Sequence, residues 1–327
     1  MAETTAMNEL ETLKALLIKQ KYHIVGAHSA VKKCRWLHQS LVKERACYKQ
    51  KFFGIESHRC VQMTPALYQC TQRCLWCWRV MPEDLGLQDY NPPFERVDEP
   101  REIIEGCLRE QKRILSGYRD LVKKGVVRAD KLEEAMRPNN FAISLAGEPT
   151  LYPRLGELIS ELKRMSFTVF LVTNGTNPGA LKAMDAEPTQ LYVTVGAPTQ
   201  DIYDMVTRPI VKDAFRKLVE TLSLLSTLSC PTVFRITSAK GLNMIETNEY
   251  SRLALFSNPT YIEVKGAMSV GYGTKTGRMG PEKMPTMAEV MRFADEIADL
   301  TGYKKIASDN DSKVVLLSRL DEPIRFR

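Results

Sequence analysis

The 327-residue chain lacks an apolar run long enough to cross a membrane, and it has no low-complexity tract and no internal repeat. Its N-terminus, MAETTAMNEL, carries acidic residues and lacks the apolar segment of a secretory signal peptide. Histidine is scarce: the four histidines are scattered over the first 60 residues, and scattered histidines are more often structural than metal-ligating. These absences exclude a membrane-spanning or repetitive protein, and they predict a cytoplasmic one whose thiols stay reduced.

Cysteine, in contrast, is concentrated in one part of the sequence. Six of the eight cysteines occur within a short stretch, at Cys34, Cys47, Cys60, Cys70, Cys74 and Cys77. The last three form a C-x3-C-x2-C motif in YQCTQRCLWCWR, which can ligate three irons of a cubic [4Fe-4S] cluster and leave the fourth iron open for a cofactor. A zinc site usually needs a second C-x2-C pair, which is missing here, and a disulfide framework does not suit a reducing compartment.

The overall composition is that of an ordinary folded protein, with 44% hydrophobic and 26% charged residues. The length suits an α/β barrel of about 250 residues with an extension. The net charge is +7, and residues 1–60 account for most of it, with eleven Lys or Arg against five Asp or Glu. This segment could bind a polyanion, or it could present a solvated basic face.

Apolar periodicity predicts that strands and helices alternate along most of the chain. An amphipathic helix is expected over 9–21, and no long regular pattern follows up to Cys60. The expected strands are 64–69, 141–145, 168–172, 191–195, 233–237 and 261–264. The expected helices are 99–124, 155–165, 178–184, 212–225, 247–256 and 287–300. This alternation predicts a parallel sheet with right-handed crossovers, whose ligands bind at the carboxyl ends of the strands.

Polar residues and glycines stand at these expected strand ends. Gly147 and Glu148 follow the second strand, where a glycine lets the backbone approach a ligand and a carboxylate can receive an ammonium group. Thr173 and Asn174 end the third strand and Thr194 ends the fourth, although such residues also cap helices.

Charged residues are expected to point into the barrel from the last two strands. Arg235 lies on the fifth strand, and Glu263 and Lys265 lie on the sixth. An inward charge needs a partner or a ligand, and Glu263 and Lys265 could pair with each other.

The triplet Cys70, Cys74 and Cys77, followed downstream by Gly147 and Glu148, resembles the motifs of radical S-adenosylmethionine (SAM) enzymes. The resemblance implies an α/β fold with a partial (β/α)6 TIM-like barrel, an N-terminal helical cap and a C-terminal extension. It also implies that SAM binds the open iron and is cleaved to a 5′-deoxyadenosyl radical. The cofactor-binding residues that it indicates are Gly147, Glu148, Thr173, Asn174, Thr194 and Arg235.

The upstream cysteines Cys34, Cys47 and Cys60 are separated by thirteen positions each, and three such thiolates could hold a second cluster. With the cysteine loop, the GEP and TNG segments and the IEVK stretch at 262–272, the whole chain resembles the archaeal tRNA 4-demethylwyosine synthases of the wyosine pathway. The resemblance implies a cap over 1–60 with the second cluster, a radical SAM barrel over 61–275 and an extension over 276–327. The implied cofactors are two [4Fe-4S] clusters and SAM.

That resemblance implies a radical carbon–carbon lyase that converts N1-methylguanosine in phenylalanine tRNA to 4-demethylwyosine, with pyruvate as the two-carbon donor. The implied partners are tRNA(Phe), pyruvate and an electron donor, and the enzyme is expected to be a monomer. A cap lysine would form a Schiff base with pyruvate: Lys49 is the first candidate and Lys51 the second, although either could be a solvated lysine in a basic run. The aromatic residues that could stack the target base, or belong to the core, are Tyr48, Phe52, Phe53 and Trp78.

Two other functions remain open at this point. One is a two-cluster radical SAM enzyme that acts on a small molecule or a protein, and the other is a non-catalytic iron–sulfur or zinc module that binds nucleic acid. The GEP and TNG segments argue against pure binding. The fourth strand departs from the superfamily pattern, because Gly196 stands where an acidic residue or serine is expected.

Overall fold

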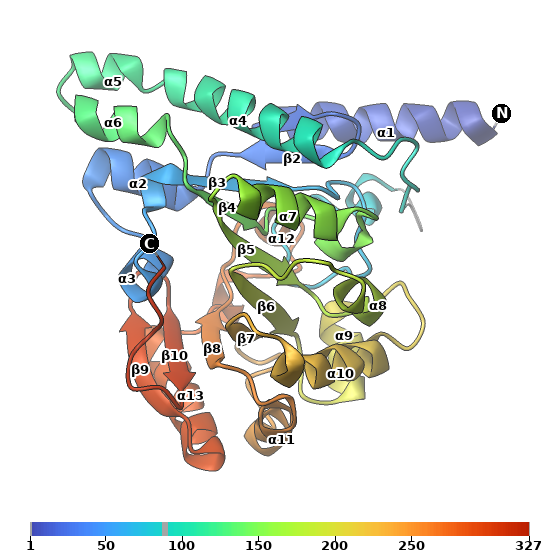
Figure 1. The fold of residues 1–327 in the computed structure, drawn as a ribbon. Helices are drawn as coiled ribbons and strands as arrows, with labels where there is room; N and C mark the ends of the chain where they lie inside the picture. Colours follow the sequence, from blue (N-terminus) through green and yellow to red (C-terminus); the bar gives the residue numbers. More distant parts are fainter. Residues whose placement is uncertain (1, 87–90, 327) are drawn as a thin grey trace.

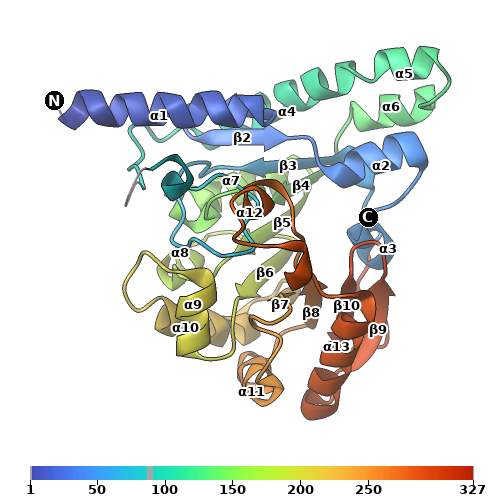
Figure 2. The same ribbon diagram turned by 180° about the vertical axis from the view of Figure 1, so that it is seen from behind.

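The computed structural model describes residues 2–86 and 91–326, and in this part of the chain ten strands form one sheet (Figures 1 and 2). The strand order is β1-β2-β3-β4-β5-β6-β7-β8-β10-β9. The strands are β1 (Tyr22–Val25), β2 (Ser29–Lys32), β3 (Cys60–Thr64), β4 (Asn140–Ile143), β5 (Thr168–Thr173), β6 (Gln190–Val195), β7 (Thr232–Ser238), β8 (Tyr261–Gly266), β9 (Lys304–Asp309) and β10 (Val314–Ser318).

The six central strands, β3 to β8, pair in parallel, each with the next in the sequence. They form the predicted partial barrel, so the predicted α/β fold is confirmed. Antiparallel strands extend it at both edges: β1 and β2 are added beside β3, and β10 and β9 beside β8. Strands from all three expected segments of the chain therefore belong to one continuous sheet.

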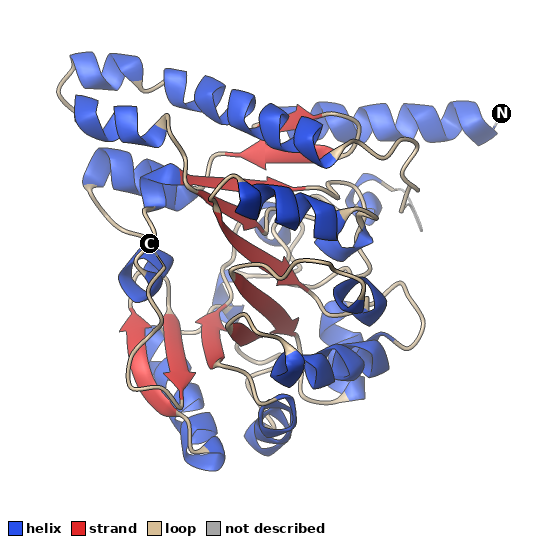
Figure 3. Ribbon diagram, in the orientation of Figure 1, coloured by secondary structure: helices blue, strands red, loops and turns tan. Residues whose placement is uncertain are grey.

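The helices that connect the parallel strands cover the convex face of this sheet (Figure 3). The helices of the described chain are α1 (Ala2–Lys19), α2 (Arg35–Lys43), α3 (Tyr48–Phe53), α4 (Pro100–Ser116), α5 (Arg119–Lys123), α6 (Ala129–Ala135), α7 (Leu155–Arg164), α8 (Pro178–Lys182), α9 (Gln200–Thr207), α10 (Ala214–Leu224), α11 (Thr247–Ser257), α12 (Gly271–Lys275) and α13 (Met287–Thr301). Alternate strand residues such as Val169 and Leu171 pack against apolar helix residues such as Leu158 to form the main core. Among the described residues, none of the helices has the length and hydropathy of a membrane-spanning segment.

The short helix α3 lies on the other, concave face and fills the amino-terminal end of the barrel. Its Phe52 and Phe53 pack with Phe170 of β5 and Tyr192 of β6. The C-terminal tail returns to the same place, where the Phe326 N–H donates to the Phe53 carbonyl at 2.7 Å. Figure 1 shows the C-terminus beside α3. With this end closed by apolar side chains, the carboxyl ends of the strands remain available for a ligand.

Some expected elements differ from those observed. The first parallel strand is Cys60–Thr64 and not 64–69, because Pro65 has no amide hydrogen to give to a neighbouring strand. The expected helical cap contains α1, α2 and α3 but also contributes the strands β1 and β2. The helix α9 and the edge strand β9 were not expected, and the expected helix over 99–124 is divided between α4 and α5.

Candidate functional site

Two cavities open on the concave face of the sheet, and each contains one of the two cysteine trios. The first chamber has a volume of about 250 Å³, and its cysteines are Cys70, Cys74 and Cys77. The second chamber has a volume of about 260 Å³, and its cysteines are Cys34, Cys47 and Cys60. A wider groove of about 630 Å³ lies outside the cysteine loop, and none of the expected site residues lines it.

The two chambers adjoin each other. Ser144, Val172 and Arg235 line both of them, so these side chains form a shared wall between the chambers. Ser144 follows β4, while the other two lie on β5 and β7. A group held in one chamber is therefore separated from the other chamber by a wall one side chain thick.

The cysteine loop of the first chamber is held by backbone hydrogen bonds to the end of α9. The N–H of Arg73 donates to the Thr207 carbonyl and the N–H of Leu75 donates to the Val206 carbonyl, each at 2.9 Å. The buried Arg79 donates to the Gln72 carbonyl at 3.1 Å. These contacts fix the loop without using the three thiols.

The electrostatics of the first chamber favour a bound cation or cluster over free thiols. Burial raises the pKa of Cys74 well above its usual value, and its neighbours Cys77 and Cys70 raise it further. Arg79 opposes this effect at Cys70, where burial is again the main cause of the raised pKa. The thiols of Cys70 and Cys74 thus resist carrying charge alone, and with Cys77 they form a donor set that iron can stabilise, because iron neutralises the thiolates.

Gly147 and Glu148 join the end of β4 to the cysteine loop. Gly147 has φ +68°, and a Cβ atom built there would lie 1.7 Å from the Ala66 carbonyl oxygen. The N–H of Glu148 donates to the Gln69 carbonyl at 2.9 Å. The glycine is therefore required by the close approach of two backbone segments, in addition to any approach of a ligand.

The Glu148 carboxylate is buried and ties two strand ends together. It accepts hydrogen bonds from the Thr173 hydroxyl at 2.6 Å and from the Asn174 N–H at 2.8 Å. Burial raises its pKa, while the hydrogen bonds from Thr150 and Thr173 act in the opposite direction. Gly147, Glu148, Thr173 and Asn174 all line the first chamber, as expected for residues that bind its ligand.

Thr194 and Arg235 line the first chamber from the next two strands. Beside Thr194, the unexpected Gly196 has a packing role: a Cβ there would lie 2.5 Å from Thr207 Cγ2 of α9 and 3.4 Å from the Trp76 ring. Gly196 therefore leaves room for the end of α9, beside the Trp76 ring that lines the first chamber.

The thiols of the second chamber come from three different elements. Cys34 precedes α2, Cys47 precedes α3 and Cys60 is the first residue of β3. Burial raises the pKa of Cys47 to about 11, and the neighbouring Cys34 contributes to that rise. The fold thus brings together three cysteines that are equally spaced in the sequence but belong to no local motif.

Lys49 and Lys51 lie on opposite sides of α3. Lys49 lines the second chamber, with its Nζ 4.1 Å from the Phe170 ring and 4.3 Å from the Tyr192 ring. Burial, and then the nearby Arg235 guanidinium, lower its pKa from 10.5 to about 8. Lys51 does not line the chamber and pairs with Asp309 instead. Lys49 is therefore the lysine whose environment suits an amine nucleophile.

Arg235 is fixed in the shared wall by two partners. Its Nε donates to Glu263 at 2.7 Å, and its Nη2 donates to the Tyr48 hydroxyl at 2.9 Å. Lys265 donates to the Ser312 carbonyl at 2.9 Å, so the expected pairing of Glu263 with Lys265 is wrong. The register explains this result, because Arg235 and Glu263 are directly opposite on β7 and β8.

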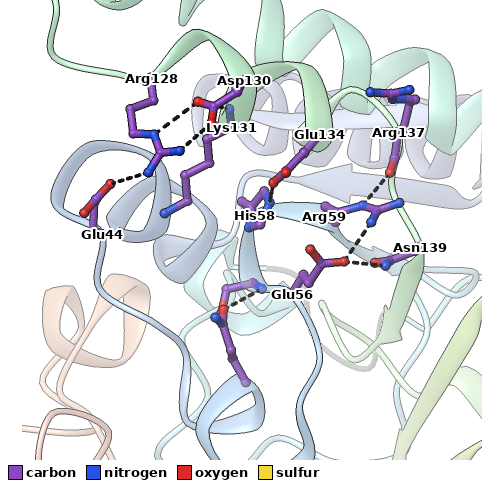
Figure 4. Close-up of polar contacts among 12 residues, drawn as sticks. Glu44, Glu56, His58, Arg59, Arg128, Asp130, Lys131, Glu134, Arg137 and Asn139 are labelled. Atoms are coloured by element: carbon purple, nitrogen blue, oxygen red, sulfur yellow. Dashed lines mark hydrogen bonds and ion pairs between the residues drawn. The ribbon is translucent and has the colours of Figure 1, made fainter. Parts of the chain in front are cut away.

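Glu56, His58 and Glu134 form a small cluster beside the second chamber, with one oxygen or nitrogen from each within 4.8 Å of the others (Figure 4). His58 Nε2 lies 2.7 Å from Glu134, and Glu56 accepts a hydrogen bond from Arg59 at 2.7 Å. Each carboxylate has a protein partner, so the cluster connects the start of β3 to α6. We assign it the structural role of holding Cys60 in place.

Two features of the site were not found by sequence reasoning. Arg278 pairs with Asp84 at 2.7 and 2.9 Å and donates to the Cys77 and Arg79 carbonyls, so it supports the cysteine loop from a distant part of the chain. The shared wall depends on strand register and has no sequence motif. Among the aromatic candidates, Phe52 and Phe53 are core residues with 3% and 0% exposure and cannot stack a base, whereas Tyr48 and Trp78 line the chambers.

Residues 65–254 match the family model of the radical SAM superfamily, and residues 256–319 match the model of wyosine base formation. The S-adenosyl-L-methionine-dependent tRNA 4-demethylwyosine synthase of Pyrococcus abyssi is 42% identical over 318 residues, which cover 96% of this chain and 90% of that protein. The solved structure of TYW1 with a lysine-pyruvate adduct bound has a TM-score of 0.84 at 34% identity and covers 96% of this chain and 97% of that one. The crystal structure of archaeal TYW1 has a TM-score of 0.78 at 31% identity, with coverages of 97% and 99%.

Proposed function

This chain belongs to the tRNA 4-demethylwyosine synthase family of radical SAM enzymes, and from this premise we propose that it converts N1-methylguanosine in tRNA(Phe) to 4-demethylwyosine with pyruvate as the two-carbon donor. Membership implies SAM and a [4Fe-4S] cluster as cofactors, and we assign that cluster to Cys70, Cys74 and Cys77. A second cluster, held by Cys34, Cys47 and Cys60, is part of the proposal.

One observation carries this proposal. The amine of Lys49 lies in the second chamber with three thiols, and that chamber shares a wall with the first one. A keto acid bound to Lys49 would be held beside the place where the first chamber holds its substrate. A related solved structure contains a lysine-pyruvate adduct, which supports a lysine in this role.

Each residue that lines the two chambers then has a proposed role. When bound, the cluster and SAM would supply the radical that removes a hydrogen atom from the substrate methyl group. The side chains of Glu148, Thr173, Asn174 and Thr194 and the backbone at Gly147 would hold SAM in the first chamber. Arg235 would contact the ligands of both chambers from the shared wall, and the Lys49 amine would attack the pyruvate keto carbon to form an imine with loss of water.

Anaerobic reconstitution followed by product analysis tests the function. With two clusters we expect about eight irons per chain, and a tRNA(Phe) that carries N1-methylguanosine should be converted to 4-demethylwyosine only when pyruvate and a reductant are present. SAM cleavage without tRNA conversion would show that another substrate is used. Absence of bound iron and of SAM cleavage would contradict the proposal altogether.

Replacement of Lys49 by alanine should abolish trapping of pyruvate on the protein by borohydride, because no amine would remain in the second chamber. Lys51→Ala is the matched control, since Lys51 pairs with Asp309 outside that chamber, and it should trap pyruvate as the parent protein does. Mass spectrometry of the trapped peptide locates the adduct. An adduct that persists in Lys49→Ala would remove Lys49 from this role.

A further inference from the structure

Lys32 is a half-buried cation one strand in from the β1 edge of the sheet and lines neither chamber. It is the last residue of β2, the strand added beside β3. Val31 packs into the core on the convex side, so strand alternation places Lys32 on the concave face with the two chambers. Its cross-strand neighbour is Tyr22 on β1.

The Lys32 ammonium lies over two aromatic rings. Its Nζ is 4.3 Å from the centroid of Tyr22 and 4.6 Å from that of Trp78, and the two rings are stacked at 6.0 Å with 13° between their planes. Because Trp78 also lines the first chamber, this platform forms part of the approach to that chamber.

Neither polar group of this platform is fully satisfied by the protein. Within residues 2–86 and 91–326, no carboxylate pairs with Lys32, and burial lowers its pKa from 10.5 to about 8, so the side chain still carries its charge at neutral pH. The Tyr22 hydroxyl is buried and has no hydrogen-bond partner in that part of the chain. A partly desolvated ammonium group whose protein contacts are aromatic rings, and not carboxylates, can still bind an anion.

We infer that Lys32, held on the Tyr22–Trp78 platform, binds a backbone phosphate of the substrate RNA next to the nucleotide that enters the first chamber. This inference rests on the proposed function, which supplies a polyanionic substrate. Phosphate contacts position a nucleic acid, and single-stranded segments are often recognised where cations and aromatic rings occur together. The excess of basic residues in the first 60 positions fits the same partner.

The neighbouring Lys33 provides a matched control. It is exposed, and its Nζ lies 5.6 Å from the ring of Tyr118, which lies between α4 and α5. Lys32 and Lys33 carry the same charge one residue apart, so a general electrostatic attraction for RNA would involve both. A specific phosphate contact near the chamber would involve Lys32 alone.

Lysine footprinting of the unmodified holoenzyme tests the inference without any substitution. The protein is acetylated with and without saturating tRNA(Phe) bearing N1-methylguanosine, and each lysine is quantified by mass spectrometry. We expect bound tRNA to slow acetylation of Lys32 at least about fivefold, with little change at Lys33. Unchanged acetylation of Lys32 in the bound complex, or equal protection by pyruvate alone, would overturn the inference.

Equilibrium binding of the same tRNA gives a second measurement. Lys32→Gln should weaken tRNA binding about tenfold. It should also reduce the magnitude of the slope of log binding constant against log salt concentration by about one, as expected for the loss of one phosphate contact. Lys32→Arg and Lys33→Gln should bind the tRNA almost as the parent does. Equal losses for Lys32→Gln and Lys33→Gln would overturn the inference. If the unmodified holoenzyme does not bind this tRNA at all, the proposed function fails; if it binds and Lys32 is unprotected, only this inference fails.

Discussion

Arg278 illustrates how single residues outside the chambers hold the site together. Its guanidinium and the Asp84 carboxylate are both nearly buried, and the same guanidinium donates to two carbonyls of the cysteine loop. Breaking a buried ion pair from one side leaves the other charge unpaired, which costs more than the pair itself contributed. The position of the cysteine loop therefore depends on a residue of the chain that follows the last barrel strand.

Replacement of Arg278 by methionine should lower the free energy of unfolding by about 3–5 kcal/mol and weaken iron binding by the Cys70 trio. Arg252→Met is the control, because Arg252 is exposed and its pair with Glu249 spans one helical turn; its cost should stay below about 1 kcal/mol. Urea unfolding and iron content after reconstitution measure the two effects. Similar losses in both variants would show that Arg278 has no special role.

His28 should make stability depend on pH. Burial lowers its pKa below 6.5, and the neutral ring is fixed because Nδ1 donates to the Pro65 carbonyl at 2.6 Å while Nε2 accepts from the Asp98 N–H at 3.0 Å. A lowered pKa in the folded state means that this stabilisation is present above pH 6.5 and is lost as the pH falls below that value. Each unit of lowering is worth about 1.4 kcal/mol.

The measurement compares the unfolding free energy of the parent and of His28→Asn between about pH 7.5 and pH 5. The variant should be less stable at high pH, because it lacks the same hydrogen bonds, but its stability should fall less steeply on acidification. Parallel curves would mean that His28 does not cause the acid sensitivity.

At the residue scale, spacing in the sequence indicated the six cysteines, and the strand-end motifs indicated the residues that line the first chamber. Neither signal could indicate Arg278, because its partner Asp84 is 194 positions away and neither residue belongs to a motif. Arg235 was expected to point inward, but its partner was not predicted, because strand register decides that Glu263 lies opposite.

The elements themselves meet at backbone contacts that admit no side chain. At Gly147 the loop after β4 and the cysteine loop approach so closely that only a glycine fits. The cysteine loop is therefore placed by the barrel, in addition to its own hydrogen bonds with α9.

Gly147→Ala should displace the cysteine loop and prevent stable binding of iron by Cys70, Cys74 and Cys77. Gly125→Ala is a close control, because Gly125 has the same φ of +68° and a Cβ atom at that position would have no other atom within 4 Å. In both variants, alanine in the left-handed backbone conformation costs about 1–2 kcal/mol of stability. Only in Gly147→Ala does the new Cβ atom also clash with the backbone at Ala66. Iron content and visible absorbance after reconstitution distinguish them, and equal iron in both would contradict the prediction.

Element prediction succeeded where the strands are buried on both faces. The strands β4 to β8 read as short apolar runs, and their observed bounds differ from the expected ones by at most two residues at either end. The prediction failed at β3, where apolar residues on both sides of Pro65 shifted it, and at β9, whose polar sequence is typical of an edge strand. Short strands such as β1 contain too few residues for a period to be visible.

At the scale of the whole molecule, the cap and the barrel are not independent units. They share one sheet, and α3 packs its aromatic residues into the barrel interior. The excess of positive charge distinguishes residues 1–60 in the sequence. In the structure, however, their apolar side chains are buried against the barrel. We therefore expect the two parts to unfold in one cooperative transition.

Urea unfolding of the cluster-free, reduced protein should therefore give one midpoint by circular dichroism and by tryptophan fluorescence. Trp36 reports on the cap, whereas Trp76 and Trp78 report on the cysteine loop. In Trp36→Phe the fluorescence comes from the loop alone, and its midpoint should still coincide with that of circular dichroism. Separate midpoints would show that the cap unfolds by itself.

The three cysteines of the second chamber come from three different elements, and this affects when a metal cluster could be inserted in the cell. Cys34 and Cys47 precede cap helices, whereas Cys60 begins the first barrel strand, so their sulfurs converge only after the chain has folded around β3. Under the proposed function, a carrier that delivers a preformed iron–sulfur cluster to this trio would therefore act on the folded protein. The Cys70 loop has the same requirement, because Arg278 and the end of α9 hold it in place from distant parts of the chain.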